Sequence, residues 1–172
     1  MTKKILILLF ILIPIKANAL IEVDITRGNL NPLPLAVSPL SIDEESRKSF
    51  EKILKKEDIG SEISNIVENN LRTSGLFNPL SKDAFLQAPD IANLKPRFED
   101  WNLIKAQALI TGKVTYVDEK LRVEFRLWDI LAAKEMMALA FTTVPSNWRR
   151  VGHIISDKVY ERLTGEKGYF DT

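Results

Sequence analysis

Residues 108–129 read ALITGKVTYVDEKLRVEFRLWD and residues 135–144 read EMMALAFTTV, and these two stretches determine the fold class. They hold three runs rich in Val, Ile, Leu, Phe and Thr, which are Ala108–Val117, Leu121–Asp129 and Glu135–Val144. Such runs, separated by short polar or small-residue breaks, are typical of β-strands joined by turns. The sequence therefore predicts an antiparallel three-stranded meander.

The second run indicates which face of the meander is buried. Its apolar residues are Leu121, Val123, Phe125 and Leu127, and they alternate with Arg122, Glu124, Arg126 and Trp128. Because successive strand residues point to opposite faces, one face is predicted to lie on the core and the other in solvent. Trp128 is therefore predicted to be an exposed aromatic residue.

Two amphipathic helices are predicted on either side of the meander in the sequence. Apolar residues at helical spacing form one stripe at Ile59, Ile63, Ile66, Val67 and Leu71, and a second at Trp148, Val151, Ile154, Ile155, Val159 and Leu163. Gly75 and Gly165 are predicted to end these helices, because glycine adopts the left-handed conformation at little cost.

The remaining segments carry weaker signals. Leu20–Thr26 alternates like a half-buried strand, whereas the prolines of Leu33–Leu40 predict a strand that lies at a sheet edge or ends early. Ser41–Lys56 is charge-dense and predicts a short helix with a solvated face. Lys82–Arg97 is predicted to be a loop with at most one helical turn. Asp100 is a candidate N-cap for a short helix through Gln107, with Trp101 and Ile104 turned inward and Leu103 as a further inward candidate.

Composition excludes several classes of function. The chain has 172 residues and a formal net charge of +1, which is too small for non-specific binding of nucleic acid. It contains no cysteine and one histidine, His153, so disulfides, thiol catalysis and most metal sites are excluded. We expect one globular domain that needs no metal and no cofactor.

The first residues predict secretion. Lys3 and Lys4 precede an apolar run of 11 residues, Ile5–Ile15, which is too short to span a bilayer but typical of a signal peptide. Ala17, Asn18 and Ala19 resemble a signal-peptidase site, so cleavage is predicted between Ala19 and Leu20. That fit disfavours the alternative of an uncleaved membrane anchor. Cleavage would leave a near-neutral chain without a stable membrane insertion, and a Gram-negative periplasm would suit it.

Residue types that often carry catalysis lack partners in this sequence. His153 has no second histidine and no cysteine to share a site with, and Glu99 and Asp100 are merely adjacent. Thr164–Gly168 follows a predicted helix instead of a strand and lacks the spacing of a phosphate-binding loop. Trp148 lies on the apolar stripe and is predicted to pack in the core. The sequence predicts that the protein is not an enzyme.

Several motifs together resemble the TolB family of the Tol-Pal envelope system. They are Ser74–Phe77 after a helix, Ala106–Val114, Leu121–Asp129, Asn147–Arg150 with His153 and Ile154, and Tyr160–Thr172. The resemblance covers nearly all of the chain after residue 19. It implies a periplasmic α/β domain, similar to the anticodon-binding-domain fold, with a mixed sheet of about five strands flanked by helices.

The resemblance also implies a partner. In the family, the extreme mature N-terminus is recognised by TolA, and it either lies against the protein or is released. The corresponding residues here are Leu20, Ile21, Glu22, Val23, Asp24, Ile25, Thr26 and Arg27. Their alternating pattern is suited to adding a strand to the edge of another sheet. The implied role is an interaction module that supports outer-membrane invagination during division and envelope integrity.

The expected organisation is a signal peptide at 1–19, a partner-binding segment at 20–32, an α/β domain at 33–165 and a junction at 166–172. In the family that junction leads to a β-propeller that binds Pal, so Pal is expected as a partner only if a propeller is supplied elsewhere. Tyr169 and Phe170 are then expected to lack packing partners. The alternative function is a periplasmic domain that binds a small ligand or a peptide, with Arg126 and Trp128 lining its site.

Overall fold

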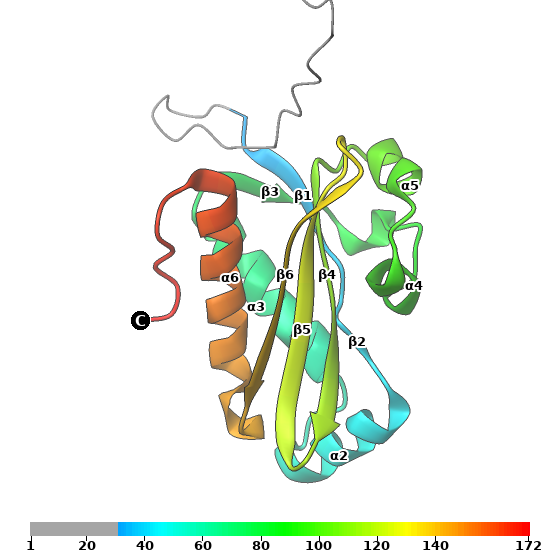
Figure 1. Cartoon of the computed structure of the whole chain (residues 1–172), viewed down its shortest axis with the longest axis vertical. Coiled ribbons are helices and arrows are strands. Elements are labelled where there is room, and N and C mark those ends of the chain that lie inside the picture. Colours follow the sequence, from blue (N-terminus) through cyan, green and yellow to red (C-terminus); the bar gives the residue numbers. More distant parts are fainter. Residues whose placement is uncertain (1–30) are drawn as a thin grey trace, which may run out of the picture.

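Three long antiparallel strands form the meander that the sequence predicts: β4 (Ala108–Val117), β5 (Lys120–Asp129) and β6 (Lys134–Thr143). The computed structural model describes residues 31–172 and joins three shorter strands to this meander in parallel pairings, namely β1 (Leu33–Val37), β2 (Ser41–Ile42) and β3 (Phe77–Pro79). The strand order is β3-β1-β4-β5-β6, with β2 beside β4 (Figure 1). The expected mixed sheet is confirmed, with six strands.

Helices cover both faces of this sheet. The helices are α2 (Glu44–Leu54), α3 (Ile59–Thr73), α4 (Pro89–Leu94), α5 (Phe98–Leu103) and α6 (Trp148–Thr164), with single 3-10 turns η1 (Lys82–Ala84) and η2 (Pro145–Asn147). Figure 1 shows α3 and α6 side by side on one face and the small helices α4 and α5 on the other side of the sheet. No helix within residues 31–172 is long and apolar enough to cross a bilayer.

The two predicted amphipathic helices are confirmed, and they enclose the larger core. Their predicted stripes are buried at Ile59, Ile63, Val67 and Leu71 in α3 and at Trp148, Val151, Ile155, Val159 and Leu163 in α6. Asp58 accepts the backbone N–H of Ser61 and so caps α3, while Gly165 ends α6 at φ 77°. A Cβ on Gly60 would lie 2.0 Å from the Leu40 carbonyl oxygen, so glycine lets α3 approach the connection between β1 and β2 closely.

Strand β1 ends early at Val37, which is one of the two alternatives predicted for Leu33–Leu40. The other alternative, a position at the sheet edge, is not observed. Strand β1 pairs with β3 on one side and with β4 on the other. Pro34 is tolerated between them because β4 begins only at Ala108, opposite Leu35, so the missing N–H of proline falls beyond the start of that ladder. The Pro34 carbonyl still accepts the Gln107 N–H at 2.9 Å.

The prediction that Lys82–Arg97 is a loop with at most one helical turn is wrong, because this segment contains both η1 and the six-residue helix α4. Tertiary contacts define it: the buried Gln87 accepts the Arg97 N–H at 2.9 Å and the Trp101 indole N–H at 2.7 Å. The predicted N-cap role of Asp100 is also wrong. Helix α5 begins at Phe98 and ends at Leu103, and Asp100 lies in its first turn, where it pairs with Arg97. Leu103 is exposed and does not turn inward, because the helix ends there.

Candidate functional site

The predicted partner-binding residues Leu20–Arg27 and the predicted cleavage site at Ala19 and Leu20 lie outside the described residues. The structure does show where such a segment would join the domain. The Leu33 N–H donates to the Leu76 carbonyl oxygen at 2.9 Å as β1 begins, and β1 is already hydrogen-bonded on both sides. The segment before Asn31 is therefore not required to complete the pairing of β1.

Trp128 is buried, which corrects the prediction that it lies on an exposed face. It is 9% exposed, its indole N–H donates to the Thr111 hydroxyl at 2.9 Å, and its ring packs edge-on against Phe98 at 5.9 Å between centroids. The reason is that this face carries a second apolar cluster, in which Trp101 and Leu109 are also buried, beneath α5. Arg126 pairs instead with Glu135 at 3.3 Å. The proposed ligand site at Arg126 and Trp128 is therefore not formed.

His153 has partners in space that the sequence did not reveal. Asn70 of α3 places its amide nitrogen 2.9 Å from His153 Nδ1 and 3.0 Å from the Ser156 hydroxyl of α6. These bonds join the two long helices across their contact, which is a structural role. Within residues 31–172 no group of three or more His, Asp or Glu side chains is arranged to hold a metal ion.

Trp148 lies in the core, as predicted, and is 4% exposed. Two cations contact its ring: the Arg149 guanidinium carbon is 4.3 Å from the centroid and Lys56 Nζ is 5.3 Å away. Such contacts stabilise a partly desolvated cation by roughly 0.5–2 kcal/mol. They tie the start of α6 to the segment between α2 and α3, and they account for Trp148 without a bound ligand.

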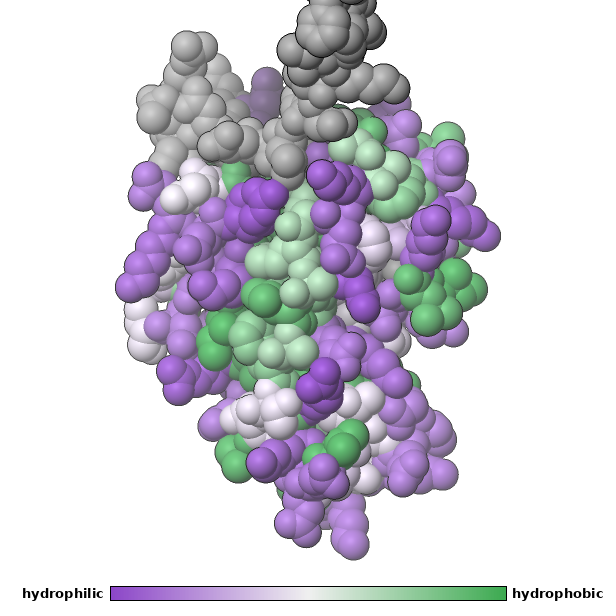
Figure 2. Space-filling view, viewed as in Figure 1, coloured by the Kyte–Doolittle hydropathy of each residue, from purple (hydrophilic) through white to green (hydrophobic). Residues whose placement is uncertain are grey.

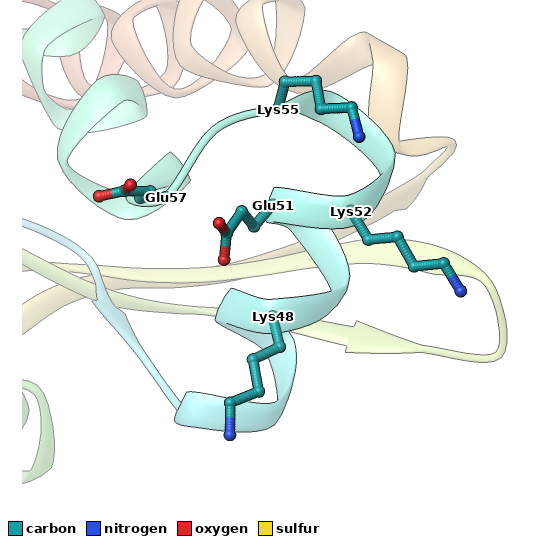
Figure 3. A pocket seen from close by; sticks show the side chains of 5 residues that line it. All are labelled: Lys48, Glu51, Lys52, Lys55 and Glu57. Carbon is teal, nitrogen blue, oxygen red and sulfur yellow. The ribbon is translucent and has the colours of Figure 1, made fainter.

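A shallow hollow of about 410 Å³ lies beside α2 (Figure 3). It is lined by Lys48, Glu51, Lys52, Lys55 and Glu57. Figure 3 shows that the three lysines point outward without converging, and that the two glutamates point to the opposite side. Mixed charges on an open surface are typical of a solvated face, as the sequence predicted for this helix, and they do not form an anion cradle.

The sheet has an exposed apolar edge along β6. Ala138, Leu139 and Ala140 are exposed, and Met137 and Phe141 are half-buried. Figure 2 shows an apolar stripe that runs down the middle of this face, over β6. No described strand pairs with the outer side of β6. The sequence signal for this surface is the absence of charged residues from Met136 to Thr143. Periodicity alone does not tell whether such an uncharged strand is buried or lies at the edge of the sheet.

Phe170 is packed, contrary to the expectation that it lacks partners. Its ring lies against Tyr160, 5.9 Å between centroids, while its N–H and that of Asp171 donate to the Asp157 carboxylate at 2.7 and 3.1 Å. Arg150 adds a bidentate pair with Asp171. A Cβ on Gly168 would lie 2.4 Å from the Asp157 Cα atom, so glycine permits this close return of the chain along α6. Tyr169 contacts Tyr160 but remains 55% exposed.

Comparison with known protein families shows that the model of the TolB amino-terminal domain matches residues 21–136. The chain belongs to the TolB amino-terminal domain family. The Tol-Pal system protein TolB of Pelagibacter ubique (strain HTCC1062) is 85% identical over 167 residues, which are 97% of this chain and 37% of that protein. The crystal structure of TolB from Acinetobacter baumannii is similar with a TM-score of 0.65 and 23% identity, covering 82% of this chain and 30% of that one.

The chain therefore spans well under half the length of the TolB relatives that it matches. The residues matched to the TolB amino-terminal domain family include Ile21–Arg27, for which the family resemblance implies a partner, and extend to Met136 near the start of β6. The structural similarity to TolB supports the mixed sheet flanked by helices.

Proposed function

We propose that this domain is a periplasmic interaction module of the Tol-Pal system that binds TolA through Leu20–Arg27. The observation that carries the proposal is the alternating pattern of this segment in a chain of the TolB amino-terminal domain family. The proposed setting is the periplasm, after cleavage between Ala19 and Leu20. The proposed role is to support outer-membrane invagination during division and envelope integrity, without enzymatic activity. Pal is proposed as a partner only where a propeller is also present.

The physical basis is strand addition. An extended segment that joins a sheet edge gains main-chain hydrogen bonds, and its alternate side chains fill pockets that provide specificity. Ile21, Val23 and Ile25 share one side of such a strand, and Glu22 and Asp24 share the other. The described domain supports this use, because β1 pairs with β3 on one side and β4 on the other, and the described residues form a buried core around it.

Direct binding to the C-terminal domain of TolA tests the proposal. Isothermal titration with the chain that begins at Leu20 is expected to show binding, and deletion of residues 20–27 is expected to abolish it. Replacing Ile21, Val23 and Ile25 together with Ser is expected to weaken binding at least about tenfold, since each buried aliphatic side chain contributes roughly 1.5–3 kcal/mol. Equal binding after the deletion would exclude this segment as the TolA site.

A charge variant serves as the matched control. Glu22→Gln with Asp24→Asn keeps the size and alternation of the segment and removes only its two acidic charges. It is expected to reduce affinity less than the serine variant, because exposed charge pairs contribute only about 0–1 kcal/mol. If the charge variant instead lost more affinity than the serine variant, the contact would be electrostatic and the strand-addition geometry would be wrong.

Cleavage between Ala19 and Leu20 is tested separately. The intact mass and N-terminal sequence of the secreted product are expected to begin at Leu20. A product that retains Ile5–Ile15 would remain attached to the membrane and would contradict the proposed free N-terminus.

A further inference from the structure

The two ends of the strand order differ in how they are protected from pairing with another chain. Strand β3 has only three residues and contains Pro79, which cannot donate to a ladder. Strand β6 has ten residues, and no described strand lies on its outer side. Natural proteins usually protect an edge with charge, proline, a bulge or short length.

Strand β6 has little of that protection. Its charged residues, Lys134 and Glu135, lie at its start, where the register shift beside Leu127 and Trp128 also falls. From Met136 to Thr143 the strand contains neither a charge nor a proline. Arg162 of α6 donates to the Met136 carbonyl oxygen at 3.4 Å, so the uncovered stretch begins at Met137.

The two faces of this edge determine the chemistry of a strand that could join it. On the helical face, Met137, Leu139 and Phe141 lie opposite the buried Leu127, Phe125 and Val123 of β5, and Leu139 is 37% exposed. On the other face stand the small residues Ala138, Ala140 and Thr142. The nearest charges there are already paired, Arg122 with Glu124 at 2.9 Å and Arg126 with Glu135 at 3.3 Å. The edge therefore suits an uncharged strand with apolar residues on one side.

We propose that the occupant is a second copy of this chain, and that two β6 strands pair antiparallel about a two-fold axis near Leu139 and Ala140. Strand β6 itself has the uncharged, half-apolar pattern that its edge requires. Antiparallel pairing also separates the Lys134 and Glu135 pairs of the two copies by most of the strand length, roughly 3.3 Å per residue. The result is one continuous sheet of two domains. This inference does not depend on the proposed binding of TolA.

The segment Leu20–Arg27 suits this edge less well. If its aliphatic residues packed on the helical face of β6, Glu22 and Asp24 would lie on the face of Arg122 and Arg126. The guanidinium groups of these two arginines are already paired with Glu124 and Glu135. Two added carboxylates would then compete with existing partners, whereas the Ala138, Ala140 and Thr142 face of a second β6 brings no charge. The charge balance therefore favours the second copy.

Sedimentation equilibrium of the chain that begins at Leu20 tests the proposal. We expect a reversible monomer–dimer equilibrium, and we expect Ala138→Lys with Ala140→Lys to weaken dimerisation about a hundredfold or more, because four like charges meet near the axis. Both alanines are exposed, so the variant is expected to keep its circular dichroism and unfolding midpoint. Asn69→Lys, at an exposed position on α3, is the control for added positive charge and should leave dimerisation unchanged.

Hydrogen exchange provides the second measurement. Amides of β6 are expected to exchange more slowly as protein concentration rises, while those of β3 are unaffected. A chain that stays monomeric up to about 1 mM, where association is worth only about 4 kcal/mol, would overturn the proposal. So would a dimer that the double lysine variant leaves intact. A dimer that forms only after removal of residues 20–27 would assign the edge to that segment and would overturn it as well.

Discussion

Trp128 and Thr111 form a buried polar contact between neighbouring strands β5 and β4. The indole N–H lies 2.9 Å from the hydroxyl oxygen, and Thr111 is fully buried. Trp128→Phe is expected to destabilise the domain by about 1–3 kcal/mol, because the buried hydroxyl loses its donor and a cavity replaces part of the ring. Urea unfolding measures this change in the free energy of unfolding.

Thr111→Val supplies the matched test of that explanation. If the hydrogen bond is the cause, the double variant should cost less than the sum of the two single variants, because neither polar group is then left unpaired. Strict additivity would show that packing of the indole ring, and not the bond, carries the effect.

Asp157 is the residue that holds the C-terminal segment against α6. Its carboxylate accepts the N–H groups of Phe170 and Asp171. Asp157→Ala is expected to raise the exchange rates of these two amides at least about tenfold, while amides in the meander keep theirs, because each bond to a charged acceptor contributes roughly 1.5–3 kcal/mol. Asp157→Asn, which keeps one acceptor oxygen, should have a smaller effect. Unchanged exchange in both variants would mean that Phe170 packing alone fixes the segment.

At the scale of single elements, helix α2 makes stability depend on pH. The pKa of Asp43 is lowered below its usual 3.8, chiefly because its carboxylate accepts the Ser46 backbone N–H at 2.8 Å, with Lys113 adding a favourable charge. A carboxyl group whose pKa is lower in the folded state stabilises it above the unfolded pKa, and this stabilisation is lost as pH falls through the lower folded value.

Asp43→Asn keeps a cap acceptor and removes the charge, so it isolates that effect. The free energy of unfolding of the wild type is expected to exceed that of the variant by roughly 0.3–1 kcal/mol at pH 7. This difference should shrink as the pH is lowered below about 3.8. The margin is small because Asp43 is exposed and solvent screens its charge. Urea unfolding at pH 7 and in the acidic range measures it; a difference that does not change with pH would assign the effect to cap geometry.

The periodicity of apolar residues correctly predicts the helices and strands that are long and regular. The meander and the helices α3 and α6 carry patterns that repeat over ten or more residues, so local sequence was sufficient. The short elements β3, α4 and α5 were missed or misplaced because contacts from elsewhere define them. Gln87 is an example, since its side-chain oxygen accepts hydrogen bonds from Arg97 and Trp101. These residues are 10 and 14 positions further along the chain, and a periodic pattern of apolar residues does not predict such contacts.

The candidate surfaces were predictable to different degrees for the same reason. The alternation of Leu20–Arg27 is local and could be seen in the sequence, whereas the exposure of β6 depends on strand order. Leu139 and Phe125 are both apolar strand residues, and only the position of β6 beyond β5 makes Leu139 partly exposed while Phe125 is buried. Trp128 was assigned to solvent because the cover that α5 provides was not predicted.

For the whole molecule, the decisive property is whether the domain is stable without the segment that precedes β1. The described members of both apolar clusters lie between Leu33 and Phe170, and the described sheet has partners on both sides of β1. A chain that begins at Asn31 is therefore expected to unfold cooperatively, with a midpoint within about 2 °C of the chain that begins at Leu20. Differential scanning calorimetry of the two chains measures this directly.

The midpoints of the two chains would differ widely if the segment before β1 were part of the core. If Ile21, Val23 and Ile25 were part of the core, their removal would cost roughly 1.5–3 kcal/mol each. For a domain of this size each kcal/mol lowers the midpoint by roughly 2–4 °C, so the shorter chain would melt at least about 10 °C lower. TolA would then have to pull the segment out of the core at that energetic cost before binding it. Equal midpoints, together with loss of TolA binding in the chain from Asn31, would instead mean that the segment is free for its partner without any cost to the fold.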